Sequence, residues 1–405
     1  MGTSTMSTPR ILVTGGGIAG NTVALQLLRA GYQITVVERA AAPRPGGQAV
    51  DLRGPSREAA DRMGLLPGIG KLQLDGRGMA HVNAKGRDVV RMPTEMFDGK
   101  GFVSDIEITR GDLNQVLLDA IADTDVQPDY RYGVWVTEVQ QDDDGVEVTF
   151  ASGHVERFDL VIGADGVHSG MRRLVFGPER DYATHLGGYM AFFTIPAPEN
   201  IEPGWLKVHS VPGANCGIRP DRDPSTVKAI VMLRNEIDPA LRGDAEAQKQ
   251  TIRRKLADGG WVTPYVLEHM ATTPDFYFDQ LARIDMPTLS SGRVTLLGDA
   301  GFCGSPLTGM GTAMAIVGAY LLAGEVTTTP GDIPGALARY EERVTPFLAE
   351  AKELPGSGTI ATIVPGSRFT LGIGRVVTRA MASRAMRPVM MRILSRTDDF
   401  ELPVY

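Results

Sequence analysis

The stretch from Arg10 to Arg39 constrains the fold more than any other part of the chain. Its features, in order, are an apolar run over residues 11–14, glycines spaced G-x-G-x-x-G, an apolar helical pattern over residues 21–30, and a second apolar run that ends at Glu38. Strand, glycine turn, helix, strand and acid follow one another in the order that a dinucleotide site requires. The stretch therefore predicts a Rossmann-type nucleotide site, with Glu38 accepting hydrogen bonds from a ribose diol.

Each glycine of this turn has a separate physical task. Gly15 permits the tight turn out of the strand, Gly17 lets the backbone approach a pyrophosphate, and Gly20 lets the helix lie close against the strand. The phosphates then lie at the helix N-terminus, around Ile18 and Ala19, where unpaired N–H groups and the positive end of the helix dipole face them.

Composition excludes several other classes of function. The 405 residues can bury a large core, and two closely joined domains are expected. The net charge of -7 and the lack of a marked basic run argue against a nucleic-acid partner. Two cysteines are too few for a disulfide framework, and no Cys/His cluster has metal-ligand spacing. Without an apolar run of membrane-spanning length or a signal peptide, the expected location is the cytoplasm.

Two more glycine-rich turns between a strand and a helix occur later in the chain. The first follows an apolar run over residues 160–162 and carries Asp165, and the second follows a run over residues 293–297 and carries Asp299. Asp299 could accept a hydrogen bond from a ribitol hydroxyl or cap a helix, and the two roles are compatible. The N–H groups around Met310, where an apolar helix begins, could hold partial negative charge on an isoalloxazine carbonyl. Three such turns indicate a large cofactor that is touched at several points.

Charged residues lie beside the first turn in two places. The irregular loop that follows Arg39 contains Arg44 and Asp51. It is either a solvated loop or a second wall of the nucleotide site, and the residues alone do not decide between the two. Arg110 stands just ahead of a helical pattern, where it is either a surface cation or in reach of a phosphate.

The middle and the end of the chain differ in character from the nucleotide motifs. Strand-like runs separated by turns over residues 183–280 predict an antiparallel sheet that interrupts the nucleotide domain and forms a wall for an apolar ligand. We expect a nucleotide domain of residues 10–80, 105–180 and 283–350, a substrate domain of residues 81–104 and 181–282, and a C-terminal helical segment of residues 356–405.

The C-terminal segment combines apolar and basic residues at helical spacing, including Arg375, Arg379, Arg384, Arg387, Arg392, Met381, Met386, Met390 and Met391. We expect a helix packed across the domains. A membrane-surface helix is the alternative, which Pro388 and the net negative charge disfavour.

Together, the three turns resemble the class A flavoprotein monooxygenases, the group of p-hydroxybenzoate hydroxylase. The matching motifs are GGGIAG with Glu38-Arg39, DLVIGADGVHSGMRR (159–173) and GRVTLLGDAGFCGSPLTGMG (292–311). The segment GGQAVDLRG (46–54), with Arg44 ahead of it, is similar to the short single-chain enzymes that include tetracycline-inactivating monooxygenases. The resemblance covers Arg10 to about Glu325. It implies an α/β fold in which a Rossmann-like FAD-binding domain is interrupted by an antiparallel-sheet substrate domain, plus a C-terminal helix.

The resemblance also implies a role for each motif residue. The adenosine half of FAD would be held by Gly15, Gly17, Ile18, Ala19, Gly20 and Glu38, joined by Arg39, Asp51 and Arg110, with Arg110 near the phosphates. Asp165 would lie in the segment that contacts both FAD and the nicotinamide cofactor, and Asp299 would bind ribitol. The flavin ring would be cradled by Pro306, Gly309, Met310 and Gly311. Arg44 matches an arginine that contacts NADPH, although its spacing from Asp51 is loose.

The implied chemistry belongs largely to the cofactor. NADPH or NADH would reduce a tightly but non-covalently bound FAD, O2 would add at its C4a carbon, and the hydroperoxide would pass an oxygen atom to an aromatic or polyketide-like small molecule. We name no catalytic acid–base residue, since the histidines have no partner visible in the sequence. A Baeyer–Villiger enzyme, an oxidase and a non-redox cyclase with structural FAD remain alternatives, and the intact loop at residues 306–311 favours redox activity.

Overall fold

The computed structural model describes residues 8–405 except 45, 98–105, 354–358, 384 and 390–398. Its central element is a six-stranded sheet whose strands lie, from one edge to the other, in the order β17 (Ser290–Ser291), β18 (Val294–Leu296), β11 (Leu160–Gly163), β1 (Arg10–Thr14), β2 (Gln33–Glu38) and β7 (Asp129–Tyr132). All neighbours are parallel except β17 and β18. The strand order reverses at β1, so the crevice at the carboxyl end of β1 is a topological switch point, where open α/β sheets bind ligands.

The middle strands of this sheet are buried on both faces, which explains their continuous apolar runs. Ile11, Leu12 and Val13 of β1 have no exposed surface. Side chains on one face of the sheet pack against the helices α1 (Ile18–Arg29), α4 (Arg110–Ala122), α9 (Gly311–Thr328) and α10 (Ile333–Ala351). Helices therefore cover the sheet in the manner that parallel strands require.

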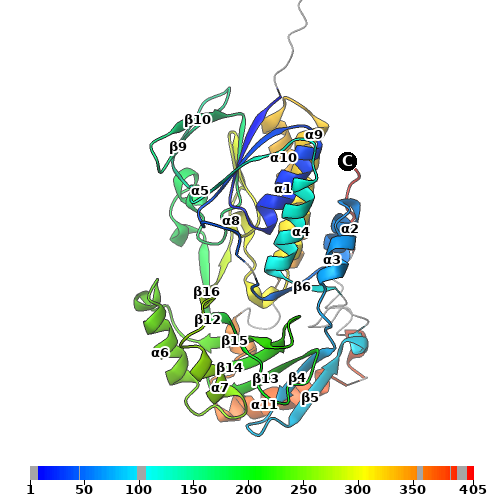
Figure 1. Cartoon of the computed structure of the whole chain (residues 1–405), viewed down its shortest axis with the longest axis vertical. Helices are drawn as coiled ribbons and strands as arrows, with labels where there is room; N and C mark the ends of the chain where they lie inside the picture. The colour runs from blue at the N-terminus through cyan, green and yellow to red at the C-terminus, as the bar shows by residue number, and fades with distance from the viewer. Residues whose placement is uncertain (1–7, 45, 98–105, 354–358, 384, 390–398) are drawn as a thin grey trace, which may run out of the picture.

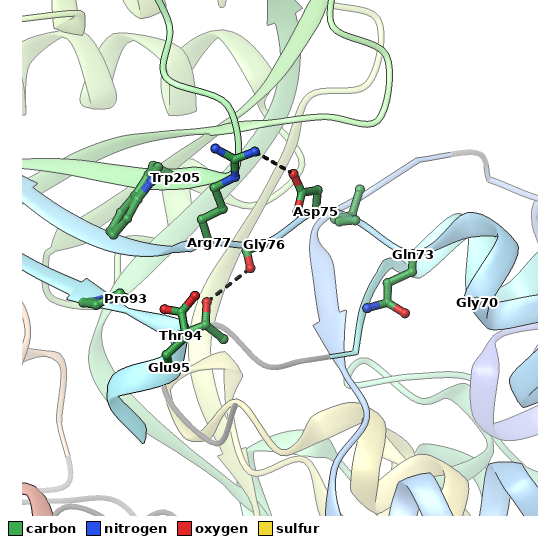
Figure 2. Close-up of a pocket in the computed structure, with 10 residues that line it drawn as sticks. Gly70, Gln73, Asp75, Gly76, Arg77, Pro93, Thr94, Glu95 and Trp205 are labelled. Carbon is green, nitrogen blue, oxygen red and sulfur yellow. Dashed lines mark hydrogen bonds and ion pairs between the residues drawn. The ribbon is translucent and has the colours of Figure 1, made fainter. Parts of the chain in front are cut away.

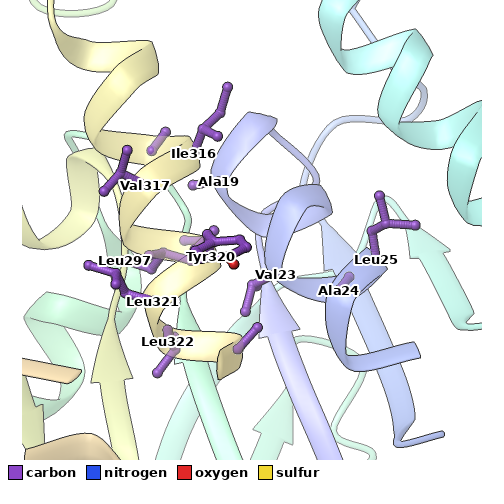
Figure 3. Close-up of a cluster of buried hydrophobic side chains, with 14 of the residues drawn as sticks. Ala19, Val23, Ala24, Leu25, Leu297, Ile316, Val317, Tyr320, Leu321 and Leu322 are labelled. Atoms are coloured by element: carbon purple, nitrogen blue, oxygen red, sulfur yellow. The ribbon is translucent and has the colours of Figure 1, made fainter. Parts of the chain in front are cut away.

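The packing of α1 against α9 brings two of the three glycine-rich turns together. Ala19 and Val23 of α1 face Ile316 and Tyr320 of α9 in the apolar core (Figure 3). Because Ala19 is small, the two helices approach closely near their N-terminal ends. The N-termini of α1 and α9 therefore open on the same side of the molecule.

Smaller elements surround the central sheet. A three-stranded meander is formed by β8 (Val136–Gln141), β9 (Val146–Phe150) and β10 (Val155–Phe158), and a two-stranded ribbon by β3 (Ala49–Asp51) and β6 (Glu107–Thr109). The short helices are α2 (Gly54–Arg62), α3 (Leu66–Leu72), α5 (Gly170–Val175) and α8 (Asp299–Phe302), with 3₁₀ turns η1 (Thr94–Phe97), η2 (Glu179–Asp181), η3 (Pro239–Leu241), η4 (Pro306–Thr308) and η5 (Ile360–Thr362).

A seven-stranded, mostly antiparallel sheet forms the lower half of the molecule (Figure 1). Its strands, in spatial order, are β16 (Tyr277–Ile284), β12 (Ala183–Pro196), β15 (Thr226–Arg234), β14 (Ala214–Pro220), β13 (Trp205–Val211), β4 (Gly78–Val82) and β5 (Asp88–Pro93). This arrangement confirms the fold class predicted from the sequence. The division of the chain into domains by residue number stays a prediction.

Side chains that alternate along β12 show what covers each face of this sheet. Ala191 and Phe193 pack beneath α6 (Ala245–Lys255) and α7 (Thr263–His269). Met190 and Phe192 point to the opposite face, because successive side chains of a strand alternate. Leu307, from the turn ahead of α9, packs into the cluster on that opposite face. The apolar side of the seven-stranded sheet is thus joined directly to the glycine loop of the nucleotide region.

The C-terminal segment contacts both halves of the molecule. The helix α11 (Arg368–Met381) lies against β5 and β13, at the bottom of Figure 1. Leu402 is buried in the core around α1 and α9, and an Arg62 guanidinium nitrogen donates to the Pro403 carbonyl at 2.7 Å. The sequence pattern extended to Arg396, but Arg384 and residues 390–398 lie outside the described part of the chain.

Candidate active site

The first glycine turn is held so tightly that two of its glycines cannot be replaced. Gly15 has φ +102°, and a Cβ built on it would lie 2.3 Å from the Ala164 carbonyl oxygen. A Cβ on Gly20 would lie 2.0 Å from the carbonyl oxygen of Gly15. These contacts support the tasks predicted for Gly15, the tight turn, and for Gly20, the close helix–strand approach.

Gly17 differs from these two glycines because open space lies in front of it. Within the described part of the chain, and apart from the neighbouring residues 16 and 18, a Cβ built on Gly17 meets one atom within 4 Å, a guanidinium nitrogen of Arg110 at 3.6 Å. Gly17 is the N-cap of α1 and provides no side-chain cap, so the N–H groups of the first turn, at Ile18 and Ala19, face this space. A helix N-terminus opposite an arginine is a suitable site for a pyrophosphate.

Glu38 holds the turn together as well as facing the nucleotide region. One carboxylate oxygen accepts from the Gly16 N–H at 2.9 Å, and the other accepts from the Ala40 N–H at 2.7 Å. A carboxylate has about four lone-pair positions, so capacity for a ribose hydroxyl remains. The sequence did not reveal that Asn21 and Asn114 also donate to the Gly16 carbonyl, at 2.9 and 3.3 Å.

The loop after β2 is attached to the start of α4. The Arg110 N–H donates to the Gln48 carbonyl at 2.9 Å, and the Gly111 N–H donates to the Gly46 carbonyl at 2.7 Å. These bonds hold the loop next to the Arg110 end of the open space, as a second wall would require. Arg39 and Arg44 are exposed, and Asp51 pairs with Arg53 at the far end of the loop. Pro45 lies outside the described residues.

Asp165 is engaged within its own turn. One carboxylate oxygen accepts from the Met171 N–H at 3.0 Å, and the other accepts from the Ser169 hydroxyl. The carboxylate thus ties the second glycine-rich turn to the start of α5. Any contact of this segment with a cofactor would therefore come mainly from its backbone.

Asp299 follows β18 and begins the short helix α8. Its side chain is exposed, although protein surrounds the carboxylate on most sides. This desolvation raises the pKa of Asp299, and the charge of Arg110 acts in the opposite direction. The opposing effects place Asp299 and Arg110 in one electrostatic environment.

The third glycine turn leads into α9 with its backbone open. Gly309 has φ +67°, in the left-handed region, and among the described residues nothing beyond the adjacent chain lies within 4 Å of a Cβ built on Gly309 or on Gly311. The N-cap residue Met310 makes no side-chain cap, so the first turn of α9 is uncapped like that of α1. Pro306 is exposed at the start of the loop.

A chain of polar groups that the sequence did not predict links the second turn to the seven-stranded sheet. His168 lies between two carboxylates, with Nδ1 3.0 Å from a Glu179 oxygen and Nε2 3.1 Å from an Asp279 oxygen. The other Asp279 oxygen accepts from the Tyr277 hydroxyl at 3.0 Å. Hydrogen bonds to Asp279 and Glu179 raise the pKa of His168 to about 10, so the imidazole is protonated at neutral pH. No local motif signals a partner 111 residues away.

A second unpredicted pair joins the β3–β6 ribbon to the seven-stranded sheet. Arg219 of β14 donates to the carboxylate of Glu107 in β6, which is 1% exposed. Burial lowers the pKa of Arg219, while Asp51 favours its charged form. The pair fixes the ribbon that carries Asp51 against the other half of the molecule.

A cavity of about 970 Å³ lies elsewhere, between α3 and the strands β4, β5 and β13 (Figure 2). Its lining is polar, and an Arg77 nitrogen lies 3.4 Å from an Asp75 oxygen. None of the residues predicted to hold the cofactor lines it, so we assign it no part in the candidate site.

Neither a metal centre nor a membrane span is present in the described part of the chain. The His, Cys, Asp and Glu side chains that the structure describes form no group of three able to hold a metal ion. None of the described helices is long and apolar enough to cross a bilayer.

The fold combines the sheet of a dinucleotide-binding protein with a second, mostly antiparallel sheet. The sequence profile of the family described as "FAD binding domain" matches residues 8–351, and the chain belongs to this family. A flavin-dependent monooxygenase of Legionella longbeachae is 36% identical over 84% of this chain and 86% of its own length. Another flavin-dependent monooxygenase, from an unknown prokaryotic organism, is 34% identical over 98% of each chain.

A solved structure agrees with these relatives. The crystal structure of tetracycline destructase Tet(51) is 33% identical, with a TM-score of 0.79 over 98% of this chain and 99% of its own. The resemblance to flavoprotein monooxygenases is therefore confirmed, and the chain is a FAD-dependent monooxygenase. The parts played by the individual site residues stay predictions.

Proposed function

We propose that this chain is a class A monooxygenase that uses NADPH or NADH and O2 to hydroxylate an aromatic or polyketide-like small molecule. One observation carries the proposal. The first turns of α1 and α9 have no side-chain cap, and a guanidinium nitrogen of Arg110 lies 3.6 Å from the position of a Cβ on Gly17. The charge of Arg110 also acts on Asp299, and Leu307, just ahead of α9, packs against an apolar cluster of the seven-stranded sheet. The open helix N-termini and the charged side chains suit a dinucleotide, and the apolar face of the sheet suits an apolar substrate.

The residues of this space suit the successive parts of FAD. The α1 N-terminus and Arg110 would hold the pyrophosphate, because N–H groups and a guanidinium both favour anions. Glu38 would accept from the ribose, and Asp299 would accept from the ribitol. The N–H groups at the start of α9 would stabilise negative charge on the flavin ring. When bound, reduced FAD supplies the activation of O2 and the transfer of one oxygen atom.

The nicotinamide cofactor has two proposed contacts. Arg44 is exposed on the loop beside Arg110, where its charge could attract a phosphate group. The turn at Asp165 offers backbone groups near the same cleft. The choice between NADPH and NADH depends on whether Arg44 meets a 2′-phosphate.

The substrate wall is apolar and partly aromatic. Phe192, Met232 and Leu307 are half-buried around a cluster on the sheet face opposite α6 and α7. The ring centroid of Phe192 lies 6.4 Å from that of Tyr277, and the charges of Arg110 and Asp299 both act on the Tyr277 hydroxyl. Flat ring systems pack well on such walls, because aromatic pairs gain beyond the area that they bury. Relatedness to a tetracycline destructase makes tetracyclines the first compounds to test.

The test is to reduce the purified yellow protein with NADPH under anaerobic conditions and then admit ¹⁸O2 with a panel of phenols and tetracyclines. The proposal expects bleaching of the flavin and a product that carries one ¹⁸O atom. Hydrogen peroxide without labelled product would indicate an oxidase. A ring-expanded, labelled lactone would indicate Baeyer–Villiger insertion. A flavin that neither nicotinamide reduces, with or without the panel, would refute the proposal in favour of structural FAD.

A further inference from the structure

The charge of this chain is segregated. Residues 354–397 contain seven arginines and no aspartate, glutamate, lysine or histidine. That stretch therefore carries +7, while the rest of the chain carries -14. The overall value of -7 conceals a basic segment, so it does not argue against an anionic partner for this segment.

The helix α11, within this segment, contacts the protein along one narrow face. Leu371 is the one buried residue of α11 among those described, and Gly374, Thr378 and Met381 are half-buried on the same side of the helix. Met381 packs with Val90 and Met92 of β5. This contact fixes which side of the helix points outward.

The outward side of α11 is apolar. Phe369 is 77% exposed and Val376 is 70% exposed, and Ile373 and Val377 are about half exposed. At 100° per residue these four side chains fall within one sector, on the side away from Leu371. Exposed apolar side chains gathered on one helix face mark an interaction surface, whereas single ones do not.

A basic stripe runs beside the apolar sector. Arg368, Arg375 and Arg379 are spaced i, i+7 and i+11, so they lie on one line along the helix, between the apolar sector and the protein. Arg368 and Arg375 are exposed, and an Arg379 guanidinium nitrogen donates to the Val89 carbonyl at 3.2 Å. We call the apolar sector and this stripe together the α11 surface.

We propose that the α11 surface docks on an anionic lipid bilayer. An apolar sector flanked by arginines on a helix that lies along the outside of a protein has the composition of an interfacial helix. Charge complementarity selects the bilayer over a second copy of the chain, because two α11 surfaces would bring their arginines together. Since α11 lies against β5 and β13, docking would place the seven-stranded sheet beside the membrane.

The experiment is flotation of the full-length, FAD-loaded protein with vesicles of phosphatidylcholine alone or with 40 mol% phosphatidylglycerol added. We expect binding to the anionic vesicles, little binding to the neutral ones, and weaker binding as salt rises. Arg368→Gln with Arg375→Gln should weaken binding about 30-fold, since each arginine near an anionic surface contributes about a fivefold gain in affinity. Phe369→Ser with Val376→Ser should weaken it at least about tenfold.

Matched controls change equally exposed residues elsewhere. Ile237→Ser removes a side chain that is 61% exposed, and Arg180→Gln removes an exposed arginine, and both should bind vesicles like the wild type. Flavin content and circular dichroism verify that every variant is folded. Absence of vesicle binding, or equal binding by all variants, would overturn the proposal. A wild-type dimer that the α11 variants dissociate in lipid-free buffer would also overturn it, by making a second copy the partner.

Discussion

Replacing Gly17 with alanine should separate cofactor binding from folding. The backbone of Gly17 has φ -86° and ψ -173°, an extended conformation open to any residue, and its Cβ would meet only Arg110 at an ordinary contact distance. Nothing in the protein itself therefore opposes the methyl group. The space that it would fill is where we place the pyrophosphate of FAD.

The two expected free-energy changes differ in size. Alanine is a poorer N-cap than glycine, so the unfolding free energy of the apoprotein should fall by only about 0.5–1 kcal/mol. Hydrogen bonds from N–H groups to a charged acceptor contribute about 1.5–3 kcal/mol each. Displacing the pyrophosphate from two N–H groups should thus cost about 3 kcal/mol or more, which is a loss of affinity of about 100-fold or greater.

The assay is a fluorescence titration of the apoprotein with FAD, combined with urea unfolding of the same apoprotein. Gly70→Ala is the control, because a Cβ there meets no atom within 4 Å in α3, away from the candidate site. Gly20→Ala is the opposite case and should unfold the apoprotein, since its Cβ would lie 2.0 Å from a carbonyl oxygen. Unchanged FAD affinity in Gly17→Ala would refute the placement of the pyrophosphate.

Three further predictions test the polar groups. Because the pKa of His168 rises from 6.5 to about 10 on folding, the protonated form stabilises the fold; that contribution is complete below pH 6.5 and is lost as the pH rises through 10. The melting temperature should therefore fall from pH 7 to pH 10 more steeply in the wild type than in His168→Gln. The difference between the two slopes should be modest, because 41% of the His168 side chain is exposed. Parallel curves for the two proteins would disprove this role of His168. Arg219→Ala should lower the unfolding free energy by about 3–5 kcal/mol, because it leaves the Glu107 charge buried and unpaired. The double variant Glu107→Leu with Arg219→Met should recover most of that loss in urea unfolding. Equal losses in the single and the double variant would count against the buried charge as the cause. Arg44→Ala should raise the KM for NADPH without emptying the flavin site, as stopped-flow reduction and flavin content would show, and unchanged reduction kinetics would remove Arg44 from the site.

The sequence predicted the nucleotide turns well because their determinants are local. Gly15 acts through its positive φ and Gly20 through close approach to the Gly15 carbonyl, and the strand and helix that flank them have distinct periodicities. The interruption of this fold by a second sheet was also predicted, since turn residues separate its strands. The order of those strands was not predicted, because β4 and β13 pair across more than a hundred residues.

The interactions that join the two sheets escaped prediction for the same physical reason. His168 appeared to be one of several histidines without a partner, yet Asp279 meets it from a different sheet. Glu107 and Arg219 are ordinary charged residues in the sequence, and only their burial makes them a structural pair. Each of these contacts depends on the docking of one sheet on the other, which leaves no local spacing or composition signal.

The difference between contacts that are local in the sequence and contacts between distant residues also bears on how substrates are selected. Most of the proposed cofactor contacts come from three short turns, so a chain can keep them while the rest of its sequence changes. The apolar cluster proposed as the substrate wall, by contrast, is assembled from β12, β15, β16, residues 360–364 and the turn at Leu307, so its shape depends on how distant parts of the chain pack together. Substitutions at His168, Glu107 or Arg219 change how the two halves dock without altering a side chain of the wall. We therefore expect them to alter which ring systems are accepted before they alter flavin content, because the groups proposed to hold FAD lie mainly on the nucleotide side.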